Sequence, residues 1–187
     1  MMAAPPRPLT GRQAQILGLI TTGLLRDGYQ PSYRGMMAEA GIASPNGIRC
    51  HLRALAAKGY IGGSGGSRAI PILAWPDGRP FRGIRAAVDS HDIVDPSGLT
   101  ETQAAVLGFA VSGLEARGYQ PSIREAQDRF KFTSKNGVCC HLRGLSGKGF
   151  IGPAGGQSRA IRFLRTPSGE RILGYVPVGE GGSPWES

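Results

Sequence analysis

The stretch SPNGIRCHLRALAAKGYI, residues 44–61, decides the fold of this chain. Ser44 is a favoured helix N-cap, and Pro45 suits the first helical position because its missing N–H would have no partner there. Gly59 is a typical residue just beyond a helix end. The stretch therefore predicts a helix from Pro45 to about Lys58. Its apolar residues recur at helical spacing along one side, at Ile48, Leu52 and Leu55.

The same stretch returns ninety residues later as SKNGVCCHLRGLSGKGFI, residues 134–151. Other shared segments are Leu-Thr at 9 and 99, Gly-Tyr-Gln-Pro-Ser at 28–32 and 118–122, and Ser-Arg-Ala-Ile at 67–70 and 158–161. About half of the positions from 9 to 62 are identical between the copies. Two copies of roughly 80 residues are too few for a solenoid, and each is large enough to hold a small core.

The repeat predicts two domains, copy one at residues 9–88 and copy two at residues 99–178. They are joined by DSHDIVDPSG, residues 89–98, which is short, acidic and turn-rich. We expect this linker to be exposed, and its ten residues span at most about 35 Å when extended. Residues 1–8 are expected to form a flexible tail and residues 179–187 a disordered one.

Further signals complete each copy. Capping-box patterns mark helix starts at Thr10–Gln13, Thr100–Gln103 and Ser122–Glu125. The first helix is expected to end near Gly28. A short second helix follows Ser32, and it has less support in copy one because Gly35 replaces the capping Glu. A strand at Tyr60–Ile61, a Gly-rich hairpin tip and a return strand come next. Each copy then has a Pro-Asp-Gly or Pro-Ser-Gly turn and a further strand.

Three helices followed by a hairpin predict a mainly α fold with small β wings. We expect two tandem winged helix-turn-helix domains, each with three helices plus a β-hairpin. In that arrangement the third helix enters the major groove of DNA.

Composition favours an anionic partner. The net charge is +9 and the pI is about 10.1. Such a balance points to nucleic acid first and an acidic membrane second, although a merely soluble basic protein is the alternative. No apolar run approaches the roughly 20 residues of a membrane span. The amino-terminal MMAAPPRP lacks the apolar core of a signal peptide.

The cysteines suggest neither a disulfide framework nor a zinc site. Their number is odd and no CxxC pair is present among Cys50, Cys139 and Cys140. A reducing cytoplasm fits best, with association with the nucleoid. We expect no cofactor, no metal, no membrane partner and no small-molecule ligand.

The polar face of the third helix is the candidate reading surface. It carries Asn46, Arg49, Cys50 and Arg53 in copy one and Asn136, Cys139, Cys140 and Arg143 in copy two. Asn can pair bidentately with adenine, and Arg with guanine or phosphate; alternatively, each Asn only supports the helix cap. Gly47 and Gly137 would let the backbone approach bases or phosphates. His51 and His141 flank the core stripe, which favours a packed or phosphate-contacting role over a catalytic one.

The remaining candidates lie beside this face. Cys50 and Cys140 are expected to face solvent or DNA, as small side chains against bases or, alternatively, as a redox switch. Arg68 and Arg159 follow the Gly-rich tips, where a wing Arg can enter a minor groove or touch phosphate. Lys58 and Lys148 stand at helix ends and are candidates for the helix dipole.

Both copies closely resemble the amino-terminal DNA-binding domain of the LexA repressor family. The resemblance covers about 130 residues, counting both copies, and its specific part is the Ser-Pro-Asn run of copy one with His-Leu-Arg-x-Leu and Lys-Gly. It implies that the start of the third helix reads the major groove and that the wing touches the minor groove. By resemblance the reading residues are Ser44, Asn46, Gly47, Arg49 and Cys50, and Ser134, Asn136, Gly137, Cys139 and Cys140. Lys135, where copy one has Pro45, is added to this set.

Two departures from the family matter. The family has acidic residues where Arg49, Cys50, Cys139 and Cys140 stand, so its target sequence does not carry over. Residues 174–180, GYVPVGE, resemble the family's self-cleavage region, but too little chain follows for a Ser-Lys peptidase domain. Self-cleavage is therefore not expected, and the repeat would replace the family's dimerisation covalently.

The sequence thus predicts a non-enzymatic, sequence-specific binder of double-stranded DNA. We expect a transcriptional repressor of bacterial or phage origin that reads two adjacent half-sites. Two alternatives remain: a protein-interaction module, and a DNA-reading subunit of a larger nucleic-acid-processing complex. An enzyme has the least support, since no phosphate loop, metal cluster or nucleophile–base pair occurs at motif spacing.

Overall fold

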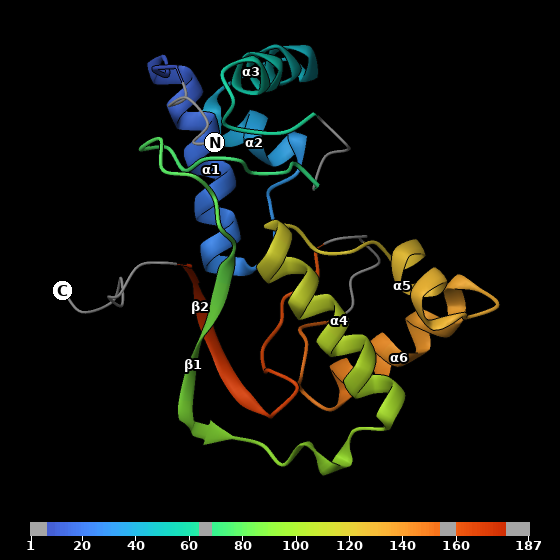
Figure 1. Cartoon of the computed structure of the whole chain (residues 1–187). Coiled ribbons are helices and arrows are strands. Elements are labelled where there is room, and N and C mark those ends of the chain that lie inside the picture. The colour runs from blue at the N-terminus through green and yellow to red at the C-terminus, as the bar shows by residue number, and fades with distance from the viewer. Residues whose placement is uncertain (1–6, 64–68, 154–159, 179–187) are drawn as a thin grey trace, which may run out of the picture.

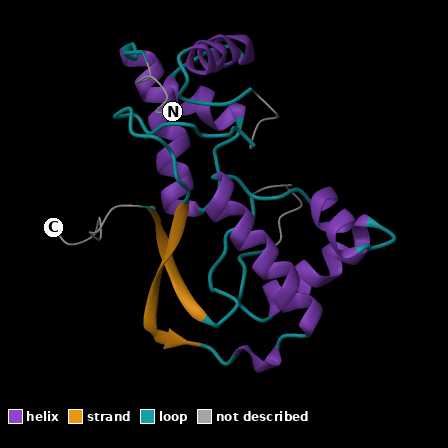
Figure 2. Cartoon of the chain, viewed as in Figure 1, coloured by secondary structure: helices purple, strands orange, loops and turns teal. Residues whose placement is uncertain are grey.

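The computed structural model describes residues 7–63, 69–153 and 160–178, and Figure 1 shows its elements. In chain order these are α1 Gly11–Asp27, α2 Tyr33–Ala40, α3 Pro45–Ala57, β1 Ile84–Ile93, a 3-10 turn at Pro96–Gly98, α4 Glu101–Arg117, α5 Ile123–Phe130, α6 Lys135–Gly147 and β2 Glu170–Pro177. Figure 2 shows that helices dominate both copies. No helix of the described ranges is long and apolar enough to cross a membrane.

The predicted capping pairs start the long helices. Thr10 accepts from the Gln13 backbone N–H while the Gln13 side chain accepts from Thr10, and Thr100 with Gln103 does the same. Gly28 ends α1 in the left-handed conformation, at φ 72°. These predictions are confirmed. They could be made from sequence because a cap depends on residues only three positions apart.

The short second helices differ between the copies. Ser122 and Glu125 form the expected capping box of α5, and α2 still forms with a single bond from the Gly35 N–H to Ser32. At the other end, Lys131 takes the left-handed conformation after α5, at φ 57°. Copy one places a glycine at the matching position, where this conformation costs nothing.

In the described part of the chain, each predicted wing has only one bridge of strand pairing at its base. Single antiparallel bridges join Ile61 to Ile72 and Ile151 to Phe163, so the strands do pair but do not extend. Arg68 and Arg159, expected on the wings, fall outside the described residues.

One apolar core runs through both copies. The buried residues form a single cluster that includes Leu24 and Ile84 from copy one and Leu114 and Tyr175 from copy two. Helix α1 packs on β2, and helix α4 packs on β1. Each copy therefore completes its core with a strand from the other, which the expectation of one small core per copy did not include.

Half of the segment expected to be a linker, residues 89–98, is strand. Residues 89–93 belong to β1, which pairs antiparallel with β2, as the crossing strands in Figure 2 show. The acidic residues that suggested an exposed linker are partly used in this pairing. The Asp92 carboxylate accepts from Arg165 at 2.7 Å, and this hydrogen bond lowers the pKa of Asp92. The segment is mostly exposed, as expected, but it is not a free tether.

The pairing of β1 with β2 relates the copies by an approximate two-fold axis. In the repeat Arg85 aligns with Val176, and Arg85 pairs with Val176 itself. A residue that faces its own equivalent lies on a two-fold axis, as in the interface of a symmetric dimer. The pairs on either side exchange places under the repeat: Ile84 with Pro177, and Ala86 with Tyr175.

Candidate nucleic-acid interface

The third helices, α3 and α6, are held by the predicted apolar stripes. The six stripe residues are all buried: Ile48, Leu52, Leu55, Val138, Leu142 and Leu145. This anchoring leaves the opposite side of each helix to solvent. Figure 1 shows α3 and α6 far apart, one in each half of the molecule.

The predicted reading residues lie on these outer faces. Exposed side chains in copy one are Ser44, Asn46, Arg49, Cys50 and Arg53, and in copy two Ser134, Lys135, Asn136, Cys140 and Arg143. Cys139 is half-buried, so it offers less surface than its counterpart Arg49. The Arg143 guanidinium lies 3.9 Å from the Cys140 sulfur. The structure thus gathers the described candidates of each copy on one face of the third helix.

The helix starts differ in detail. Ser44 accepts from the Gly47 N–H at 3.2 Å, whereas Ser134 makes no side-chain cap bond. The glycines have an internal reason as well as the expected one. A Cβ on Gly47 would lie 2.7 Å from the Ile42 side chain and one on Gly137 3.3 Å from the Phe132 ring, so a larger residue at either position would have to displace the side chain before the helix.

Several basic side chains near the third helices make contacts within the protein. His141 is half-buried with its ring centroid 5.1 Å from that of Phe132, as a packed histidine would be. The Lys58 ammonium donates to the Pro8 carbonyl at 2.6 Å and to Gln13 at 2.7 Å. Lys148 repeats this arrangement with Gly98 and Gln103. In each copy the lysine therefore joins the end of the third helix to the start of the first helix. This role differs from the interaction with the helix dipole that the sequence suggested.

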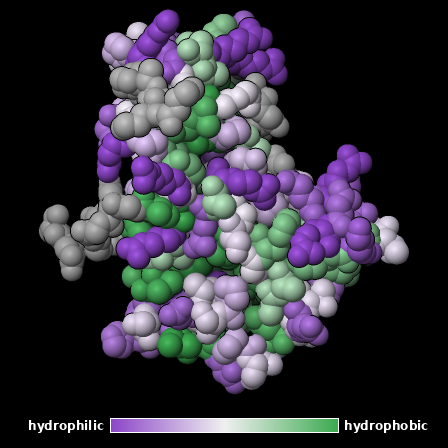
Figure 3. Space-filling model, in the orientation of Figure 1, coloured by the Kyte–Doolittle hydropathy of each residue, from purple (hydrophilic) through white to green (hydrophobic). Residues whose placement is uncertain are grey.

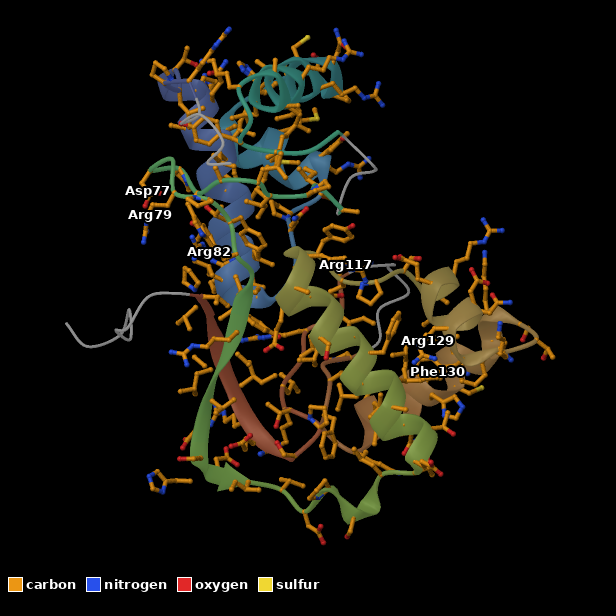
Figure 4. All side chains as sticks on the ribbon, in the orientation of Figure 1. Asp77, Arg79, Arg82, Arg117, Arg129 and Phe130 are labelled. Atoms are coloured by element: carbon orange, nitrogen blue, oxygen red, sulfur yellow. The ribbon has the colours of Figure 1, made fainter. Side chains whose placement is uncertain are left out.

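The reading helices carry cations without neighbouring acid in sequence. No Asp or Glu occurs from residue 40 to 62 or from 129 to 152. Figure 3 shows hydrophilic surface over α3 and around the α5–α6 turn. Some acids elsewhere are paired within the fold, as Figure 4 illustrates for Asp77 beside Arg79, where the hydrogen bond from Arg79 lowers the pKa of Asp77. The net charge is therefore concentrated where an anion would meet the helices.

No metal centre is apparent in the described part of the chain. It contains no group of three or more His, Cys, Asp or Glu side chains placed to hold a metal ion. The three cysteines are free thiols, with Cys50 and Cys140 exposed.

Sequence reasoning missed two buried residues, Gln30 and Gln120. They stand at matching places in the repeated Gly-Tyr-Gln-Pro-Ser segment and are 1% and 2% exposed. The identity of a polar residue in both copies was the available signal, but no local pattern indicated that these side chains would be buried.

Comparison with known proteins identifies the repeated unit. A sequence model described as LexA DNA binding domain matches residues 6–69 and again residues 96–160. The LexA repressor of Desulfatibacillum aliphaticivorans is 42% identical over 80 residues, which are 43% of this chain and 38% of that protein. The LexA repressor of Burkholderia cenocepacia (strain HI2424) is 34% identical over 141 residues, 74% of this chain and 60% of that protein. The chain thus spans about 38–60% of the length of these relatives. Strands β1 and β2 lie outside both matched ranges.

Proposed function

Because the chain belongs to the LexA DNA-binding domain family, we propose that it is a sequence-specific, double-stranded DNA-binding protein that acts as a transcriptional repressor. Each copy serves as one winged helix-turn-helix reading head, and the two heads read adjacent half-sites. Repression follows from occupancy of the site, and the relatives' name, LexA repressor, supports this role.

The single observation that carries the proposal is the pair of exposed, acid-free faces on α3 and α6. Each face projects an Asn and at least one Arg from a helix anchored by three buried apolar residues. Such a helix can lie in the major groove, which is wide enough to admit it. A rigidly anchored helix holds its side chains at fixed spacing, as base readout requires.

Specific roles follow from side-chain chemistry. Asn46 and Asn136 pair with adenine edges, since an amide can donate and accept at once. Arg49, Arg53 and Arg143 bind guanine or phosphate. Ser44, Gly47, Cys50, Ser134, Lys135, Gly137, Cys139 and Cys140 complete the contact surface, and Arg68 and Arg159 serve the wings. Phosphate contacts position the protein, and base contacts give specificity.

Selection of bound duplexes from a random pool tests the proposal directly. Enrichment of one sequence is expected, with affinity that falls by about 10³ or more between 50 and 200 mM salt. Asn46→Ala and Asn136→Ala should each weaken binding to that sequence by about 1–3 kcal/mol and relax preference in different halves. Failure to enrich any sequence, or loss of the same half in both variants, refutes the assignment of two reading heads.

A second function, contact with a protein partner in a larger complex, is favoured by exposed apolar side chains on and beside the β1–β2 ribbon. Leu173 is 55% and Ile93 is 56% exposed, which is unusual for large aliphatic residues in strands. A protein partner whose binding is insensitive to salt and does not exclude DNA supports this second function. Leu173→Ser should abolish that binding and leave DNA binding unchanged.

A further inference from the structure

The buried glutamines of the repeated Gly-Tyr-Gln-Pro-Ser segments have no role in the reading faces. Gln30 and Gln120 stand just after α1 and α4, at the point where the two copies meet. Burying an amide side chain is costly unless its polar atoms are hydrogen-bonded. Their partners therefore indicate why glutamine occupies both positions.

Gln30 joins its own wing to the other copy. Its Oε1 accepts from the Ile70 N–H at 2.9 Å, and its Nε2 donates to the Ile70 carbonyl at 2.8 Å. The same Nε2 donates to the carbonyl of Gly118, in copy two, at 2.8 Å. Ile70 lies on the return segment of the wing, so one side chain fixes both the wing and the neighbouring copy.

Gln120 repeats this arrangement in the opposite direction. Its Oε1 accepts from the Ile161 N–H at 3.0 Å, and its Nε2 donates to the Ile161 carbonyl. That Nε2 also donates to the carbonyl of Gly28, in copy one, at 2.8 Å. The two glutamines are thus reciprocal, as the approximate two-fold axis through the ribbon requires.

Close packing surrounds these hydrogen bonds. A Cβ on Gly28 would lie 2.7 Å from the Tyr175 ring, and a Cβ on Gly118 would lie 2.9 Å from the Phe81 ring. Both glycines have positive φ and each directly presents its carbonyl to a glutamine of the other copy. An aromatic ring therefore packs directly on the backbone of each of these glycines, and little room is left for the two copies to rotate relative to each other.

Side chains of copy two also hold the ribbon. The Glu115 carboxylate of α4 accepts from the Ala86 N–H of β1 at 2.9 Å. Together with strand pairing, this fixes copy one's last strand against copy two's first helix. The strands β1 and β2 lie outside the two ranges that match the family, whereas Gln30 and Gln120 lie within them.

We infer that Gln30 and Gln120 are positioning residues that lock both reading helices and both wings into one arrangement. The inference rests on the proposed function. The chain is then a rigid reader of two half-sites at a single separation. The half-sites are in inverted orientation because the heads are related by a two-fold axis. A flexible ten-residue tether would instead accept a range of separations and orientations.

The spacing of the half-sites gives the decisive test. The probe is the duplex selected by the wild-type chain, altered by inserting two base pairs at its centre. The insertion turns one half-site by about 70° and moves it by about 7 Å relative to the other. Wild-type affinity should fall at least about 30-fold, close to that of a duplex with one half-site. A loss below about 3-fold overturns the rigid coupling, and absence of any selected duplex overturns the proposed function instead.

Substitutions distinguish the contribution of the two glutamines from that of the other contacts between the copies. In Gln30→Met with Gln120→Met, the inserted pairs should cost at least about 3-fold less than in wild type, with the remaining cost due to the β1–β2 pairing, while affinity for a single half-site stays within about 2-fold of wild type. Affinity for the unaltered site should fall about 10-fold as the heads lose their fixed relation. Gln30→Glu, which keeps the acceptor for the Ile70 N–H but removes the donor to the Ile70 and Gly118 carbonyls, should show part of the same effect.

The matched control is Gln13→Met with Gln103→Met. These glutamines are also buried in both copies, and their bonds, including those from Lys58 and Lys148 that tie each third helix to the first, stay within each copy. Affinity for a single half-site can therefore fall, but the dependence on spacing should persist. Strict spacing in the Gln30 and Gln120 variants would refute their positioning role. The wild-type spacing profile needs no variant, so it tests the coupling even if a substituted chain fails to fold.

Discussion

Removal of the Tyr175 side chain should destabilise copy one, although Tyr175 belongs to copy two. The ring is 2% exposed and lies against Gly28 at the end of α1. Truncating a fully buried aromatic residue to alanine costs about 3–5 kcal/mol through lost burial and the cavity left behind. In a molecule with one continuous core, the whole of this cost should appear in the unfolding of both copies.

Tryptophan fluorescence can follow copy one alone. Trp75 is buried in copy one, and the other tryptophan, Trp185, can be replaced by Phe. In that background, urea unfolding followed by Trp75 should shift by about 3–5 kcal/mol on Tyr175→Ala, together with the helical signal. If the Trp75 transition keeps its midpoint while a separate helical transition moves, the copies have independent cores and the reasoning is refuted.

The conservative change at the same position gives the opposite sign. Among the described residues, the Tyr175 hydroxyl is the one buried side-chain polar atom without a hydrogen-bond partner, and burial raises its pKa. Tyr175→Phe removes an unpaired polar group whose burial costs about 1–3 kcal/mol, so it should stabilise the chain by about 1 kcal/mol. A loss of stability would show that the hydroxyl is hydrogen-bonded in solution.

Three further outcomes are expected. Lys131→Gly should stabilise the chain by about 1 kcal/mol in urea unfolding, because glycine adopts the left-handed conformation without strain; destabilisation would mean that the lysine side chain makes a compensating contact. Treatment with N-ethylmaleimide should weaken DNA binding at least about 10-fold through the exposed Cys50 and Cys140, and a variant with serine at both positions should resist the treatment. Asp92→Asn should be less stable than wild type near neutral pH, and this difference should shrink as the pH falls below the ordinary Asp pKa of about 3.9 and vanish once Asp92 is protonated, because a carboxylate with a lowered pKa stabilises the fold only while it is ionised. A pH-independent difference would exclude the charge of Asp92 as its cause.

The helices and their faces could be read from the sequence. Ser44, Pro45 and the apolar residues of 44–61 act within three or four positions of one another, so local spacing sufficed to predict α3, its buried stripe and its exposed polar face. The repeat then extended the same reading to α6. The direct contact of these faces with DNA stays a prediction.

The relation between the two copies was decided only by tertiary structure. The hydrogen bonds of Gln30 and Gln120 to the opposite copy join residues 88 and 92 positions apart, and β1 pairs with a strand from the far end of the chain. Acidic and turn-forming residues at 89–98 favoured a linker by local preference, but pairing with β2 and with Arg165 outweighed that preference. Local periodicity fixes which face of an element is apolar, whereas the choice of partner depends on complementarity between distant segments. The sequence therefore predicted two reading heads, and only the packed chain determined that the two copies are held as one body.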